Sequence, residues 1–158
     1  RLGAAGAAIA LAALCLSGSL DLLRATDRNT TAIPWATADG LAVAHWIRDE
    51  LPPDAVLAVA PTNTHPAIAL SGHAVVAGYP GWIWDLAIAD WRQRVDDEIT
   101  ILRGGPAALD AAERRHVDYV VIGPLERVPD VGADDAWWAT HAPPIFRSGD
   151  WTVYPVDT

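Results

Sequence analysis

Between Gly78 and Asp85 the chain reads Gly-Tyr-Pro-Gly-Trp-Ile-Trp-Asp, and Trp91 and Arg92 follow a few residues later. Aromatic rings beside Asp, Asn and Arg side chains suit a sugar, because sugars present apolar C–H faces and a rim of hydroxyl groups. Large aromatic residues also commonly supply core packing. The stretch therefore predicts either a ligand-binding loop or an aromatic segment buried in its own domain.

Two polar loops carry side chains that would complete such a site. One loop follows a continuous apolar run at residues 55–60, and the other follows residues 117–122, which are apolar except for Asp118. Both runs are typical of a strand buried in a parallel sheet. In parallel sheets, ligands collect outside the carboxyl ends of the strands. We expect the aromatic loop to fold over that edge and form one crevice there. The candidate ligand-binding residues are Asn63, His65, Tyr79, Trp82, Trp84, Asp85, Glu126 and Arg127.

Structural roles compete with this interpretation for each of those residues. Trp82 and Trp84 can be core residues, and Tyr79-Pro80-Gly81 can be an ordinary turn. Glu126 and Arg127 can form a local ion pair. The acidic run Asp96-Asp97-Glu98 is typical of the solvated face of a helix.

Other chemistry lacks a supporting motif. The five histidines show no paired spacing that would suit a metal, and no serine lies in a G-x-S-x-G elbow. We assign no catalytic residue, no metal ligand and no cofactor. The net charge is −9 and the chain contains no lysine, which argues against nucleic acid as a partner.

The elements around the candidate residues predict a small layered α/β domain with a mostly parallel sheet. Apolar residues at helical spacing predict helices over 37–51, 91–102 and from Pro106 onward. Helix followed by strand is the unit of such a sheet. Ser148-Gly149-Asp150 between two apolar runs indicates a C-terminal antiparallel hairpin.

The first stretch, Leu2–Leu20, carries no charge. As a helix it would be about 28 Å long at roughly 1.5 Å per residue, which matches the bilayer core. A transmembrane helix is the favoured interpretation; a signal peptide and a buried Ala-rich helix are the alternatives. We expect a membrane segment at 1–24, a polar linker at 25–36 and a globular domain at 37–158. Because the chain begins at Arg1 and contains no methionine, we expect a fragment of a longer protein.

Five stretches in this order form a pattern that resembles a known family: Leu51–Leu57, Ser71-Gly72, Gly78–Trp84, Arg94 with the acidic helix up to Gly104-Gly105, and Val117–Arg127. The pattern resembles the C-terminal extracytoplasmic domain of polytopic GT-C-type membrane glycosyltransferases, such as protein O-mannosyltransferases and aminoarabinose-transferase-like enzymes. The resemblance covers residues 37 to 127.

The resemblance implies a parent enzyme that transfers sugar from a polyprenyl-phosphate donor at the outer face of the membrane. The family's catalytic acid lies in an early extracytoplasmic loop that has no counterpart here, so this chain alone would be a non-catalytic domain that shapes or caps the acceptor side. Its expected partners are the membrane and a glycan, a polyprenyl-phosphate sugar or an acceptor polypeptide. The alternatives are a membrane-anchored extracytoplasmic binding module unrelated to glycosyl transfer, and a small secreted hydrolase with a dispersed site.

Overall fold

The computed structural model describes residues 3–26 and 36–156. The chain divides into two compact units, Arg1–Trp35 and Ala36–Thr158, and each is described by itself. The expected linker at 25–36 falls largely outside the described residues.

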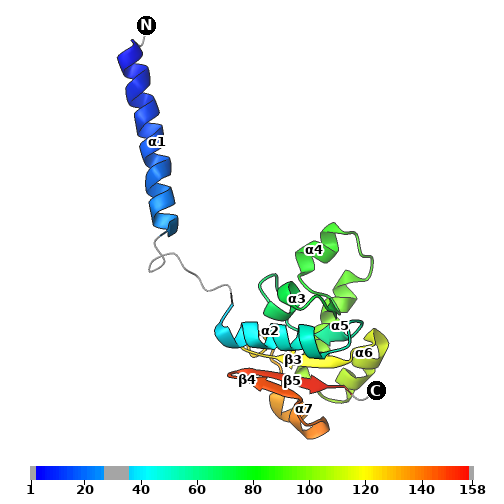
Figure 1. Cartoon of the computed structure of the whole chain (residues 1–158). Helices are drawn as coiled ribbons and strands as arrows, with labels where there is room; N and C mark the ends of the chain where they lie inside the picture. The colour runs from blue at the N-terminus through cyan, green and yellow to red at the C-terminus, as the bar shows by residue number, and fades with distance from the viewer. Residues whose placement is uncertain (1–2, 27–35, 157–158) are drawn as a thin grey trace. The chain divides into compact units, whose positions relative to one another are not determined.

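The first unit contains one helix, α1 (Ala4–Thr26), drawn in blue in Figure 1. Its segment Gly6–Leu23 has a mean hydropathy of 1.8 over 18 residues. By length and composition, this is the one helix in the described part of the chain that could cross a membrane. Its leucines are exposed within this unit.

The second unit is built on a five-stranded mixed sheet (Figure 1). Its strands are β1 (Val56–Ala58), β2 (Ala74–Val75), β3 (Tyr119–Ile122), β4 (Phe146–Ser148) and β5 (Trp151–Pro155), in the order β2-β1-β3-β5-β4. The first three strands in that order run parallel, and β3, β5 and β4 pair antiparallel. The predicted fold class, an α/β domain whose parallel strands are closed by a C-terminal antiparallel hairpin, is confirmed.

Helices cover both faces of this sheet. They are α2 (Ala38–Glu50), α3 (Pro66–Leu70), α5 (Trp91–Arg103), α6 (Pro106–Arg115) and α7 (Asp135–His141). A further short helix, α4 (Pro80–Asp85), packs against α5. One apolar core joins α2 and α3 to the sheet. The other core joins α5, α6 and α7 to the opposite face. Successive side chains of a strand point to opposite faces of the sheet, so one strand contributes to both cores. In β5, Val153 packs in the first core and Tyr154 in the second.

The local sequence explains where the main helices begin and end. The hydroxyl of Thr37 accepts a hydrogen bond from Gly40 N–H at 3.0 Å and caps the N-terminus of α2. Gly104 and Gly105 both have positive φ, at 73° and 89°, so the chain can turn sharply between α5 and α6. Pro106 then occupies the first turn of α6, where its missing N–H is not needed.

Two sequence predictions about local structure are wrong. The Pro80–Asp85 segment is helix α4 and not a loop, because Pro80 starts the helix and Tyr79 stands at its N-cap. Asp97 and Glu98 are buried and not solvated. Asp97 bonds Arg114 at 2.9 Å and Arg115 at 2.8 Å, which ties α5 to α6.

Candidate functional site

A buried polar cluster lies where β1 and β3 end. The carboxylate of Glu126 accepts hydrogen bonds from Ala60 N–H at 2.7 Å, from Gly123 N–H at 2.7 Å and from His65 Nε2 at 2.8 Å. All three partners are N–H donors, which suits a carboxylate that acts only as an acceptor. Glu126 therefore joins the ends of two neighbouring strands to the loop that starts α3.

The hydrogen bonds of His65 define its tautomer. Its Nδ1 accepts from Ala67 N–H at 3.1 Å, so the ring proton lies on Nε2 and is donated to Glu126. His65 is the N-cap of α3, and its ring packs edge-on against Trp151 with centroids 5.3 Å apart. His65 and Glu126 are both 0% exposed. The pair therefore orders the edge of the sheet and cannot touch a ligand in this conformation.

A second acid, Glu98 of α5, is buried beside this cluster. Burial raises its pKa well above the ordinary value; hydrogen bonds from the Val59 and Ala77 backbone oppose the shift, and the charge of Glu126 adds to it. Its Oε1 accepts from Val59 N–H at 3.4 Å, while its Oε2 has no partner among the residues described. The environment therefore favours the protonated acid.

The aromatic segment lies on the surface. Trp82 is 50% exposed and Trp84 is 64% exposed, so the core interpretation of these two rings does not hold. Pro80, Gly81, Trp84 and Trp91 line a shallow, almost wholly apolar hollow of about 290 Å³. Trp91 also stacks under the Arg92 guanidinium, 4.5 Å from the ring centroid. A hollow with this lining suits an apolar or C–H-rich surface.

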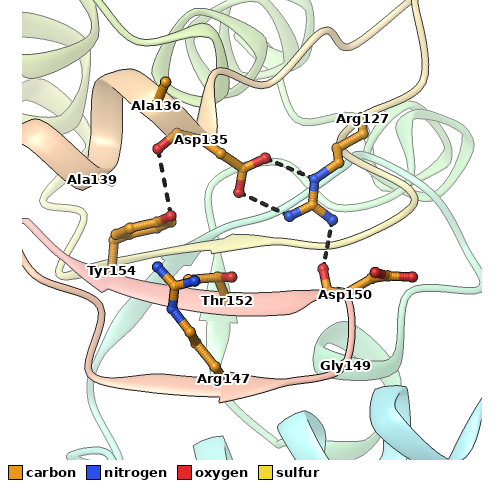
Figure 2. Close-up of a pocket in the computed structure, with 9 residues that line it drawn as sticks. All are labelled: Arg127, Asp135, Ala136, Ala139, Arg147, Gly149, Asp150, Thr152 and Tyr154. Carbon is orange, nitrogen blue, oxygen red and sulfur yellow. Dashed lines mark hydrogen bonds and ion pairs between the residues drawn. The ribbon is translucent and has the colours of Figure 1, made fainter.

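A larger hollow of about 410 Å³ lies between α7 and the β4–β5 hairpin (Figure 2). Arg127 enters it from the loop after β3 and binds both carboxylate oxygens of Asp135, at 2.7 and 2.8 Å. Arg127 also donates to the carbonyl of Asp150 at 2.5 Å. The alternative in which Glu126 and Arg127 form a local ion pair is therefore wrong, because the two side chains bind different partners.

The structure distributes the eight predicted residues over three places. His65 and Glu126 contact each other, and Arg127 lines the larger hollow. Trp84 lines the apolar hollow, which shares no lining residue with the larger one. The remaining four, Asn63, Tyr79, Trp82 and Asp85, are exposed. One crevice that contains all eight stays a prediction.

The sequence analysis did not identify several polar residues of the buried cluster and of the larger hollow. Glu98 lies three and four residues before Ile101 and Leu102, so helical periodicity puts it on their buried face. Asp135, Arg147 and Tyr154 come together only through α7 and the hairpin. Arg147 and Thr152 are cross-strand partners, which the hairpin register alone would have indicated.

Comparisons with known proteins add one finding about the fold. No family model matches the chain, and no curated protein matches it. Among solved structures, the chain is similar to the C-terminal globular domain of an oligosaccharyltransferase from Archaeoglobus fulgidus. The match has 16% identity and a TM-score of 0.50, and covers 77% of this chain and 98% of that domain. The globular unit thus has a fold that resembles a C-terminal domain of an oligosaccharyltransferase.

Proposed function

We propose that the globular unit is a non-catalytic extracytoplasmic domain of an integral-membrane glycosyltransferase with a polyprenyl-phosphate sugar donor. The observation that carries the proposal is the fold, which matches 98% of the length of an oligosaccharyltransferase domain. A helix in the same chain that is long and apolar enough to span a membrane supports it. The domain would shape or cap the acceptor side of the enzyme.

The buried acids support a non-catalytic role. A general acid or base must come within hydrogen-bond reach of the substrate. Glu98 and Glu126 are 0% exposed, and Glu126 is already held by three N–H donors. Glu126 therefore has a structural role at the edge of the sheet, and the transfer chemistry would belong to another part of the intact protein.

The aromatic surface of α4 is the part that we assign to the acceptor side. Trp82 and Trp84 present exposed rings, and Asp85 ends the helix beside them. Exposed indole rings offer flat apolar faces, and a neighbouring carboxylate accepts hydrogen bonds from hydroxyl or amide groups. This combination suits a glycan or an acceptor polypeptide.

A second candidate function needs no glycosyl transfer. The apolar hollow at Trp84 and Trp91 and the exposed Trp82 ring would equally serve a membrane-anchored binding module. In that case α1 would act only as an anchor. The two functions differ in whether the intact protein moves a sugar.

The test is a transfer assay with the intact protein in its membranes. Radiolabelled polyprenyl-phosphate sugars are supplied as donors in one arm and nucleotide sugars in the other. Transfer of label to a glycan or polypeptide from the lipid-linked donor alone supports the proposal. Binding of glycan or polypeptide without transfer from any donor would contradict it and favour the binding module.

A further inference from the structure

Arg147 differs from the other arginines of the described globular unit. Each of the others is bound by a carboxylate, a carbonyl oxygen or an aromatic ring. Arg147 is exposed, and within residues 36–156 its side chain forms no hydrogen bond or ion pair. In a chain with a net charge of −9, an unpaired guanidinium that lines a hollow is a notable exception.

The guanidinium lies where other donors converge. Arg147 of β4 pairs with Thr152 of β5, so both side chains project from the same face as Tyr154. In Figure 2 the Arg147 side chain crosses toward the Tyr154 ring. Both residues line the same hollow, and the charge of Arg147 lowers the pKa of Tyr154, against the larger effects of burial and Asp135. This wall of the hollow therefore presents a cation beside two hydroxyl groups.

The Tyr154 hydroxyl makes a long contact with the backbone and also interacts with the Thr152 side chain beside it. It donates to the backbone oxygen of Asp135 at 3.5 Å, which is long for a bond between two oxygens. Burial, and then the charge of Asp135, raise the pKa of Tyr154 above its ordinary value. The hydroxyl therefore keeps its proton at neutral pH and remains a donor.

The opposite wall limits the charge that a ligand can carry. Both oxygens of Asp135 are occupied by Arg127, so these two charges offset each other and Asp135 does not neutralise Arg147. Asp150 adds a second carboxylate, which points away from Arg147 in Figure 2. Because Arg127 offsets Asp135, Asp150 is the acid left to oppose Arg147, and the lining holds no surplus positive charge for a dianion. A planar carboxylate matches the guanidinium fork with a single charge.

We propose that this hollow binds the carboxylate group of a small acidic ligand through Arg147, with the Tyr154 hydroxyl as a second donor. Its volume of about 410 Å³ lies in the range of small-molecule sites, so there is room for a sugar-sized body beside the carboxylate. The site is separate from the α4 surface and does not depend on the glycosyltransferase role.

The experiment titrates the full chain, isotope-labelled in detergent micelles, with glucuronate while amide chemical shifts are followed. We expect saturable shifts centred on β4 and β5. Arg147→Gln should weaken binding by about tenfold or more, because a charge-assisted bidentate contact is lost. Arg92→Gln removes the same charge from the α5 surface and should leave the affinity within about twofold. Glucose, which has no carboxylate, should not saturate.

Tyr154→Phe provides a variant without a charge change, and we expect it to weaken glucuronate binding severalfold. Shifts away from the hollow report whether each variant keeps the fold. Non-saturating glucuronate shifts, or equal affinity in Arg147→Gln, would overturn the proposal. Inorganic phosphate that binds as tightly as glucuronate would also overturn it, since the site would then be a general anion contact.

Discussion

Nε2 of His65 lies 2.8 Å from Oε1 of Glu126, and this contact joins residues 61 positions apart at the edge of the sheet. Ala67 N–H donates to the other ring nitrogen, Nδ1, so His65 caps the N-terminus of α3 and also donates a hydrogen bond to Glu126. The same carboxylate receives N–H groups from the ends of β1 and β3. The sheet edge therefore depends on one acceptor.

Glu126→Gln tests that dependence. The amide nitrogen of glutamine must face at least one of three N–H donors, which leaves a buried donor without an acceptor. We expect a loss of about 1–3 kcal/mol in the free energy of unfolding. Chemical denaturation of the full chain measures it. Glu113→Gln, at an exposed acid of α6, is the control and should change little; equal losses in both variants would refute the role of Glu126.

Glu98→Gln should change how stability depends on pH. The folded-state pKa of Glu98 is raised, so below the ordinary value of 4.5 both states are protonated. As the pH rises toward the folded-state pKa, only the unfolded state loses its proton, and the free energy of unfolding falls. Glutamine imitates the protonated acid and removes this loss, so the variant should become more stable than the parent as the pH rises from 4.5 toward neutrality.

Unfolding curves at pH 4.5 and 7 provide the measurement for Glu98. Asp96→Asn, at an exposed acid of the same helix, supplies the matched control. A Glu98→Gln variant whose stability relative to the parent is the same at both pH values would show that the acid is not held protonated.

The two cores could be predicted from the sequence because burial leaves a direct pattern. Continuous apolar runs gave β1 and β3, and turn residues gave the β4–β5 hairpin. Helix α4 was missed because Pro80-Gly81 is typical of a turn, yet proline also suits a first helical position.

The site residues were harder to predict than the strands, because their partners are distant in sequence. Glu126 meets His65 and Ala60 only after β1 and β3 pair. The burial of Glu98 was hidden because a pattern of hydrophobicity scores any carboxylate as outward-facing. The position of a buried apolar residue can therefore be predicted from periodicity, whereas the partners of a buried polar residue become known only from the tertiary structure.

The proposed acceptor surface predicts a specific effect of Trp84→Ala. Because Trp84 is largely exposed, the free energy of unfolding should change by no more than about 0.5 kcal/mol. Loss of an aromatic contact of about 0.5–1.5 kcal/mol should raise the acceptor KM severalfold in the transfer assay. Leu86→Ala removes a comparably exposed apolar side chain without a ring. An equal rise in KM for Leu86→Ala, or unfolding of Trp84→Ala, would contradict the assignment.

The proposed orientation predicts that the globular unit is accessible from outside the cell. Cys15 is the single cysteine of these 158 residues. In a background in which Cys15 and any cysteine of the intact parent are replaced by alanine, Asp54→Cys can be labelled selectively at an exposed turn. A membrane-impermeant maleimide should label intact cells and permeabilised cells equally. Labelling that requires permeabilisation would place the unit in the cytoplasm.

The intact mass of the native protein, extracted from its membranes and matched to its reading frame, tests the central claim most directly. A domain of a polytopic glycosyltransferase predicts several further hydrophobic spans before Arg1, with an acidic residue in the first extracytoplasmic loop. A native chain in which α1 is the only span and a methionine directly precedes Arg1 would contradict the claim.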